Sequence, residues 1–238
     1  MLPLLDIYNN SMMQLQRVLE HFGWGIAASS LTEEEKQEIR SRENQNIERH
    51  YLDWEGGLND FAEIENNNHI FYLSLKVIDL QNPDAPHAAI IMRFDERIPG
   101  VQIYMIENFI RNQVTALNGK VFITALLFAT IFATNIDVNE DRGNETSVIL
   151  VNPDDNLLGY YRDFGFYRDV TNFTWMSAEI PDIEDNIKRK IDLMDDEFPD
   201  DDDIEALPNP DRIGGLATED VNDGPIADNN DGVAPDEQ

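Results

Sequence analysis

The feature that most constrains the fold of this 238-residue chain is a largely apolar segment, VFITALLFATIFAT, at residues 121–134. Its fourteen residues fall short of the roughly 18 apolar residues that a membrane-spanning helix needs. The segment therefore predicts a helix buried against a sheet. Because burial of a large apolar side chain contributes roughly 1.5–3 kcal/mol, we expect this helix to be the centre of stability.

Three segments with strand character precede this helix, at residues 69–80, 88–94 and 101–110, and turn residues separate them. The third segment is apolar on both of its alternating faces. Strict alternation places Val101, Ile103, Met105 and Phe109 on one face and Tyr104, Ile106 and Ile110 on the other. A strand of this kind is typical of the centre of a sheet that is covered on both sides.

Helices are expected on either side of these strands. Apolar residues recur every three or four positions over residues 8–22, which indicates an amphipathic helix. Thr32 and Glu35 form a candidate capping box, so a second helix is expected to run to about residue 50. After the apolar helix, a polar loop at 139–144 leads to a strand at 147–151, a helix at 156–163 and a strand at 170–176. This order predicts an α/β (α+β) domain.

The charge of the chain is strongly negative: 47 acidic residues stand against 17 basic ones, a net charge of -30. The last 44 residues, 195–238, hold sixteen of the acids and only Arg212 as a base. Such a chain repels nucleic acids and anionic membranes, whereas a basic protein partner fits it. We expect a folded domain at 1–180, a short charged helix or linker at 181–194, and an acidic tail at 195–238 that is disordered unless docked on a partner.

Several kinds of site are excluded or disfavoured by composition. The chain has no Cys, so it has no disulfide, thiolate metal site or cysteine nucleophile. The four histidines, at positions 21, 50, 69 and 87, lack the spacing of a metal site. The Asp200 to Asp203 run lacks the glycine turn and distal Glu of a calcium-binding loop. The N-terminus has no signal-like pattern, so we expect a soluble, cytoplasmic protein.

The segment from Tyr161 to Phe166, YRDFGF, resembles the Tyr-x-x-x-Gly-Phe signature of the GNAT superfamily of acyl-CoA-dependent N-acyltransferases. With the element order, the resemblance covers residues 9–178. It implies a mixed, largely antiparallel sheet with helices on both faces, and Tyr161 as the general acid that protonates the leaving thiolate. A phenol with the ordinary pKa of about 10 stays protonated at neutral pH. The alternative is that Tyr161 is a core aromatic, because other aromatics crowd the same segment.

A second segment, NGKVFITALL at residues 118–127, is similar to the family's Arg-Gly-x-Gly-x-Gly/Ala pyrophosphate loop. The resemblance implies acetyl-CoA as cofactor, bound through Asn118, Gly119, Lys120 and Thr124. The sequence departs from the pattern at Asn118 and at Val121 and Ile123, which replace small residues. Branched side chains obstruct the approach of the main chain to phosphate. Loss of two charged hydrogen bonds would weaken binding on the order of a hundredfold to ten-thousandfold.

Glu107 is the one carboxylate within the central strand segment. Alternation places it on the face of Met105 and Phe109, where it would be a general base for an amine; the alternative is a strand-end Glu that points to solvent. Two main hypotheses remain. The chain is an N-acyltransferase that moves an acetyl or other acyl group from acyl-CoA to an amine. Alternatively, it is a catalytically silent GNAT-fold component of a multi-protein assembly that binds through its acidic tail.

A third hypothesis rests on charge alone. It is that the chain is an acidic decoy that competes with nucleic acid for a basic protein.

Overall fold

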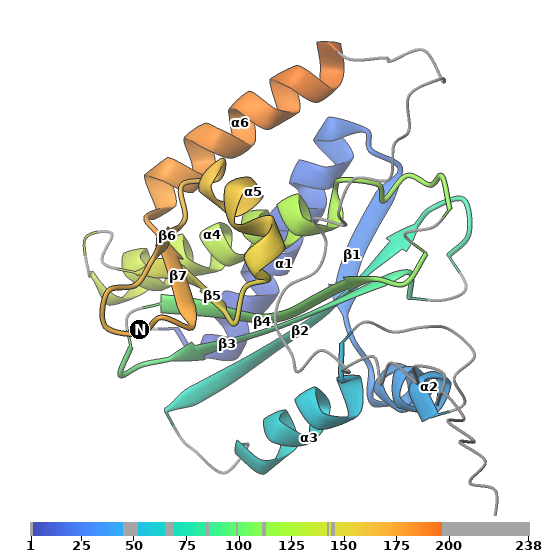
Figure 1. Cartoon of the computed structure of the whole chain (residues 1–238), viewed down its shortest axis with the longest axis horizontal. Coiled ribbons are helices and arrows are strands. Elements are labelled where there is room, and N and C mark those ends of the chain that lie inside the picture. Colours follow the sequence, from blue (N-terminus) through green and yellow to red (C-terminus); the bar gives the residue numbers. More distant parts are fainter. Residues whose placement is uncertain are drawn as a thin grey trace, which may run out of the picture.

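The computed structural model describes residues 2–44, 52–64, 69–83, 86–98, 100–110, 113–141, 143 and 146–196. Its elements lie around one seven-stranded sheet (Figure 1). In chain order they are α1 (Leu4–Phe22), β1 (Ile26–Ser30), α2 (Glu33–Asn44), α3 (Trp54–Ile64), β2 (Ile70–Asp79), β3 (Ala88–Asp95), β4 (Gly100–Asn108), α4 (Val121–Glu140), β5 (Ser147–Val151), the short 3-10 helix η1 (Asp155–Leu157), α5 (Leu158–Arg162), β6 (Tyr167–Arg168), β7 (Trp175–Ala178) and α6 (Ile180–Asp196).

The strands of the sheet lie in the order β1-β2-β3-β4-β5-β7-β6. Every neighbouring pair is antiparallel except β4 and β5, which are parallel. The β4–β5 ladder runs from Gly100 beside Ser147 to Ile103 beside Leu150, whereas β4 itself continues to Asn108. Helices cover both faces, so the expected fold class, a mixed and largely antiparallel sheet with helices on both faces, is confirmed.

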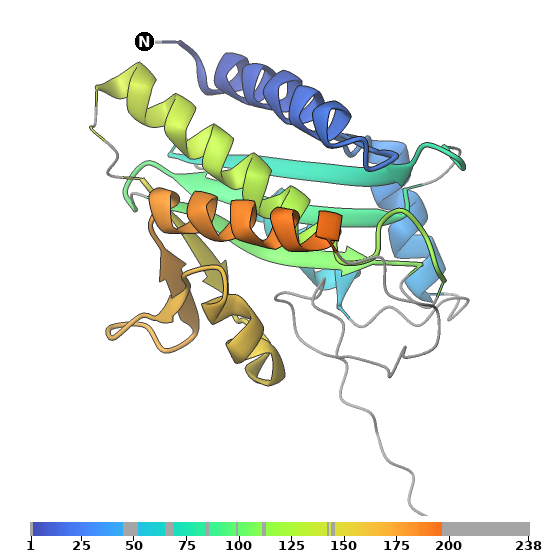
Figure 2. The ribbon, with the colours of Figure 1, turned by 90° about the horizontal axis from the view of Figure 1, so that it is seen from above.

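The two faces of the sheet carry different helices. On one face α1, α4 and α6 lie side by side, with α4 between the other two (Figure 2). On the opposite face lie α2 and α3 (Figure 1). Each face has its own apolar cluster, a large one around α4 and a smaller one around Trp54 of α3. At residues 181–194, where a short charged helix or a linker was expected, the structure has the helix α6, whose Ile183, Ile187 and Ile191 belong to the large cluster.

Helix α4 is the apolar helix expected at 121–134, and it continues six residues further, to Glu140. By length and composition it is the one helix of the described chain that could cross a membrane, yet 72% of its apolar window is buried inside the fold. It contacts α1, α6, β4 and β5. It is therefore a core helix, covered by protein where a membrane helix would face lipid.

The central position of β4 is confirmed, because eight of its nine residues are buried. The expected division of its side chains between the faces is wrong, however. The register between β3 and β4 shifts between Ile91 and Met92, where Tyr104 is an extra residue. Such a bulge reverses the alternation. Val101, Ile103 and Ile106 therefore pack in the large cluster, while Met105 packs on the other face with Ala89 and Ile91.

The next expectations concern the start and end of α2 and the helix at 156–163. The capping box is confirmed: the N–H of Thr32 donates to the Glu35 carboxylate (2.9 Å), and the N–H of Glu35 donates to the Thr32 hydroxyl (3.2 Å). Helix α2 is described only to Asn44, so its expected end near residue 50 lies outside the described residues. The expected helix at 156–163 is confirmed as η1 and α5.

The strand expected at 170–176 is wrong over its first half. Residues 169–174 form a turn in which Asp169 and Asn172 accept hydrogen bonds from residues two or three positions ahead. Side chains of this kind compete with strand pairing by bonding their own backbone. The strand β7 therefore begins only at Trp175.

Candidate functional site

The carboxylate of Glu107 is enclosed on the sheet face that α2 and α3 cover. Its side chain is 1% exposed, and its Oε2 accepts a hydrogen bond of 2.7 Å from the indole nitrogen of Trp54. Glu107 therefore lies on the face of Met105 and Phe109, as expected, and the alternative of a Glu that points to solvent is wrong. A carboxylate buried in an apolar cluster is costly unless it is hydrogen-bonded, so the bond from Trp54 is important for this arrangement.

The beginning of α3 positions Trp54 for this bond. The Asp53 carboxylate accepts the N–H of Gly56 (2.7 Å), and the Asp53 carbonyl accepts the N–H of Gly57 (3.0 Å). These bonds satisfy the first amides of the helix and hold Trp54, which is 0% exposed, against β4. The indole also makes an edge contact with the Phe109 ring at 5.6 Å. No sequence pattern pointed to Trp54, because 53 residues separate it from Glu107.

Tyr161 lies on α5 within the large apolar cluster and is 0% exposed. Its ring contacts Phe122 of α4 at 5.7 Å and Tyr160 at 6.1 Å between centroids. The chain then turns at Gly165, whose φ of +90° is a conformation that other residues rarely adopt. The amides of Phe164 and Phe166 both donate to the Tyr161 carbonyl. The YRDFGF segment therefore closes α5 against the start of α4.

The two candidate catalytic residues are not brought together on one face. Glu107 is bonded to Trp54, a member of the smaller cluster, while Tyr161 belongs to the cluster around α4 on the opposite face. A substrate would have to reach both of them past the end of the β4–β5 ladder at Ile103 and Leu150. The role of either residue in catalysis stays a prediction.

The loop before α4 carries the candidate cofactor residues Asn118, Gly119 and Lys120. Gly119 has a φ of +72°, so the turn requires a residue without a side chain. Asn118 is exposed, and its side-chain oxygen accepts a bond of 3.3 Å from the Thr115 hydroxyl. The Nζ of Lys120 lies 5.6 Å from the centre of the ring of Trp24, which comes just before β1.

Lys120 is half-buried, and this burial lowers the pKa of its ammonium group below the ordinary value, while the charge of Asp79 opposes the shift. The cation is therefore already engaged by an aromatic face and a carboxylate of its own chain. Thr124, the fourth candidate, is fully buried, and its hydroxyl donates to the Lys120 carbonyl at 2.8 Å. The Thr124 hydroxyl is therefore committed to its own helix, whereas the Lys120 ammonium keeps N–H donors that its contact with the Trp24 ring does not use.

The first turns of α4 are enclosed on every side. Six consecutive residues, from Val121 to Leu126, are each 0% exposed. Because a turn of helix takes 3.6 residues, six in sequence face all directions around the axis. The backbone amides of this helix start are thus out of contact with solvent, and Phe122 packs on Tyr160, Tyr161 and Phe164.

These residues do not fit the diphosphate of acyl-CoA. A phosphate held by a helix N-terminus needs backbone N–H groups that it can reach. Here the residues that offer those groups, Val121 and Ile123 among them, are covered by protein. The Val121 and Ile123 side chains belong to the apolar core, where the family pattern has small residues.

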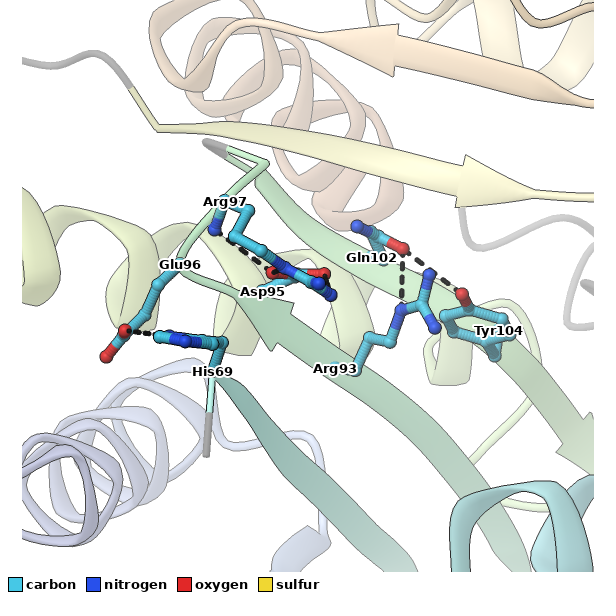
Figure 3. Close-up of polar contacts among 7 residues, drawn as sticks. All are labelled: His69, Arg93, Asp95, Glu96, Arg97, Gln102 and Tyr104. Carbon is cyan, nitrogen blue, oxygen red and sulfur yellow. Dashed lines mark hydrogen bonds and ion pairs between the residues drawn. The ribbon is translucent and has the colours of Figure 1, made fainter. Parts of the chain in front are cut away.

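A group of polar residues that the sequence analysis did not single out lies on β3, β4 and the turn between them (Figure 3). The Arg93 Nε and the Tyr104 hydroxyl both donate to the Gln102 side-chain oxygen, at 2.8 Å and 3.1 Å. Beside them Arg97 makes two bonds, of 2.9 Å and 2.7 Å, to the Asp95 carboxylate. These bonds with Arg97 hold the pKa of Asp95 below its ordinary value. The Asp95–Arg97 pair fixes the turn that leads into β4.

Metal ligands do not gather in the part of the chain that the structure describes: no three His, Cys, Asp or Glu side chains there could hold a metal ion. His69 instead lies beside Glu96, with its Nδ1 at 3.3 Å from a carboxylate oxygen.

Comparison with known proteins bears on the fold alone. No protein-family profile and no curated protein sequence matches the chain. Among solved structures, two chimeras of spermidine N-acetyltransferase from Vibrio cholerae and hSSAT are similar to it, with 12% identity and TM-scores of 0.42 and 0.40. Each alignment covers 68% of this chain and 99% of the other.

Proposed function

We propose that this chain is a GNAT-fold protein that acts as an interaction component of a protein assembly and does not use acyl-CoA. The observation that carries this proposal is the complete burial of Val121 to Leu126, the helix start where the diphosphate would have to lie. Entry of the cofactor would require displacement of the aromatic contacts of Phe122 and of the core positions of Val121 and Ile123. The commitment of the Thr124 hydroxyl to the Lys120 carbonyl supports the same conclusion.

An exposed loop supports the interaction role. Between β6 and β7 the side chains of Val170 and Phe173 are 86% and 75% exposed, and Tyr167 is 66% exposed. The side chains of Asp169 and Asn172 accept hydrogen bonds from backbone N–H groups within the turn and so stabilise it. A rigid turn that presents apolar groups to solvent is typical of a protein-binding surface. The net charge of -30 suits a partner with basic residues around an apolar pocket.

Calorimetric titration of the full chain with acetyl-CoA tests the first half of the proposal. We expect no heat of binding up to about 1 mM, and a micromolar Kd would contradict the proposal. The interaction role is tested by purifying the chain from the cells that naturally produce it and analysing it by size-exclusion chromatography. We expect a partner to co-elute in stoichiometric amount and to be lost with F173D. Elution without any partner would contradict the interaction role.

The burial of Glu107 favours a second candidate function, acyl transfer to an amine. Its carboxylate is held by Trp54 on the strand where the GNAT resemblance places a general base. In this proposal Glu107 accepts the proton of the ammonium group, and Tyr161 donates to the leaving group. This second function predicts measurable acyl transfer to amines such as polyamines. The E107Q variant is expected to lose that activity. The first proposal expects no such activity in either protein.

A further inference from the structure

The outward face of α1 carries a stripe of exposed residues whose pattern is complementary to itself. Leu2, Asp6, Asn10, Met13 and Arg17 follow one another at spacings of three and four, so they share one face of the helix or its N-terminal extension. All five are exposed, and the buried residues of α1 lie on the opposite side. The stripe has an acid near one end, a base near the other, and amide and apolar groups between them.

Within the described part of the chain, the two charges of the stripe have no ion-pair partner. Neither Asp6 nor Arg17 forms an ion pair with another of the residues that the structure describes. They cannot pair with each other, because eleven helical residues separate them by roughly 16 Å. Glu20 lies three residues ahead of Arg17 on α1 and is also exposed, but no ion pair joins these two described residues. A partner surface with the opposite order of charges would satisfy both groups.

The groove beside the stripe has no acidic residue among the described residues that line it. It lies between α1 and the C-terminal half of α4 and has a volume of about 350 Å³. Among the described residues that line it, none is Asp or Glu. Its polar lining consists of Asn10, Gln14, Asn135, Asn139 and Arg17. Asn139 is bonded to the Leu2 backbone, and Asn135 donates to the Ser11 hydroxyl. The carboxamides of Asn10 and Gln14 can both donate and accept hydrogen bonds, so they can bond to a copy of the same surface.

Apolar groups border the same surface. Met13 is 55% exposed, and Val138 of α4 is 78% exposed. For a protein of net charge -30, contact with a second copy is repulsive wherever carboxylates meet. The α1–α4 surface avoids this repulsion, and its apolar side chains gain from burial.

We propose that two copies of the chain associate through this surface, with their α1 helices antiparallel and Asp6 of each copy opposite Arg17 of the other. A two-fold interface joins the same patch on both subunits, so residue i meets j wherever j meets i. The two ion pairs then lie at the ends of the contact. Asn10 and Met13 lie near the two-fold axis. This association is independent of any acyltransferase activity.

Charge reversal across the two-fold axis tests the proposal. Sedimentation equilibrium of the full chain at low salt is expected to give twice the 27.3 kDa of one chain. D6K and R17E each place like charges opposite one another, so each is expected to dimerise at least tenfold more weakly. An equimolar mixture of the two variants restores opposite charges, and so does the double variant D6K/R17E. Both are expected to associate like the unchanged chain.

The controls separate this interface from others. F173D places a charge on the exposed β6–β7 loop and is expected to leave the dimer intact, whereas M13E is expected to break it. Circular dichroism checks that each variant remains folded. An unchanged chain that is monomeric, or a dimer that survives both D6K and R17E, would overturn the proposal. A mixture of D6K and R17E that stays monomeric would also overturn it.

Discussion

The indole nitrogen of Trp54 donates a 2.7 Å hydrogen bond to Glu107, and both side chains are closed off from solvent. The bond joins the start of α3 to the central strand β4. It also places a charged group in the smaller apolar cluster, where an unpaired carboxylate would be strongly unfavourable. The pair thereby sets the position of α3 on the sheet.

Replacement of Trp54 by Phe removes the donor and keeps the ring contact with Phe109. We expect W54F to lower the free energy of unfolding by about 2–4 kcal/mol, because a charge is left buried without this partner. In a cycle of W54F, E107Q and the double variant, urea unfolding at pH 7 should give a coupling energy of about 1.5–3 kcal/mol. Additive losses would show that the bond does not stabilise the fold.

The turn after α5 requires glycine at position 165. Gly165 has a φ of +90°, and a Cβ there would lie 3.0 Å from the Cβ of Asp182. We expect G165A to destabilise the protein by about 1–3 kcal/mol in thermal or urea unfolding. Gly159 is the matched control, because it lies in α5 with nothing within 4 Å of an added Cβ. G159A should raise stability by roughly 0.5–1 kcal/mol, and equal effects of the two changes would contradict this account.

The pair of Asp95 and Arg97 gives the stability a defined dependence on acid. Because Arg97 holds the pKa of Asp95 below its ordinary value, the pair stabilises the fold above the unfolded pKa of about 3.9. This contribution is lost as the pH falls through the lower, folded pKa. We expect D95N to cost about 1–2 kcal/mol at pH 7 and progressively less below pH 4. A cost that is the same at pH 3 and pH 7 would contradict the assignment.

Lys120 gives the opposite kind of dependence at alkaline pH. Burial lowers its pKa in the folded protein below the unfolded value of about 10.4, so the unfolded chain holds more protons between these two values. Stability therefore rises with pH in that window. K120M removes the titrating group, and we expect the stability of K120M relative to the unchanged chain to decline as the pH approaches 10.4. Unfolding curves between pH 7 and 10.5 measure the free energy of unfolding of both proteins. If the value for K120M rose relative to that of the unchanged chain over this range, the account would be contradicted.

The elements with long, strong patterns could be predicted from the sequence. The apolar run of α4, the strand β2 and the strand β5 all lie where hydrophobicity places them. Two elements gave weak signals. The strand β1 has the small-residue sequence IAASS, and α3 contains two adjacent glycines, Gly56 and Gly57. Tertiary contacts, such as the packing of Trp54 and Leu58 on Met105, stabilise α3 despite its low propensity.

The candidate site was predicted in part. Alternation gave the correct face for Glu107, even though the bulge at Tyr104 reversed the faces of residues before it. The partner Trp54 could not be found, because no local pattern joins residues 53 positions apart. The replacement of small residues by Val121 and Ile123 signalled a changed cofactor loop. The aromatic residues of α5 help to cover the start of α4. Only the tertiary structure brings these two helices together, so the sequence could not predict this burial.

The burial of the start of α4 is the central claim, and amide NMR tests it most directly. In the full-length, ¹⁵N-labelled chain, the amide signals of Val121, Phe122 and Ile123 are followed while acetyl-CoA is added to about 1 mM. We expect these signals to stay in place and to exchange slowly with deuterium, since protein covers the groups. Saturable shifts of these three signals with a micromolar Kd would contradict the claim.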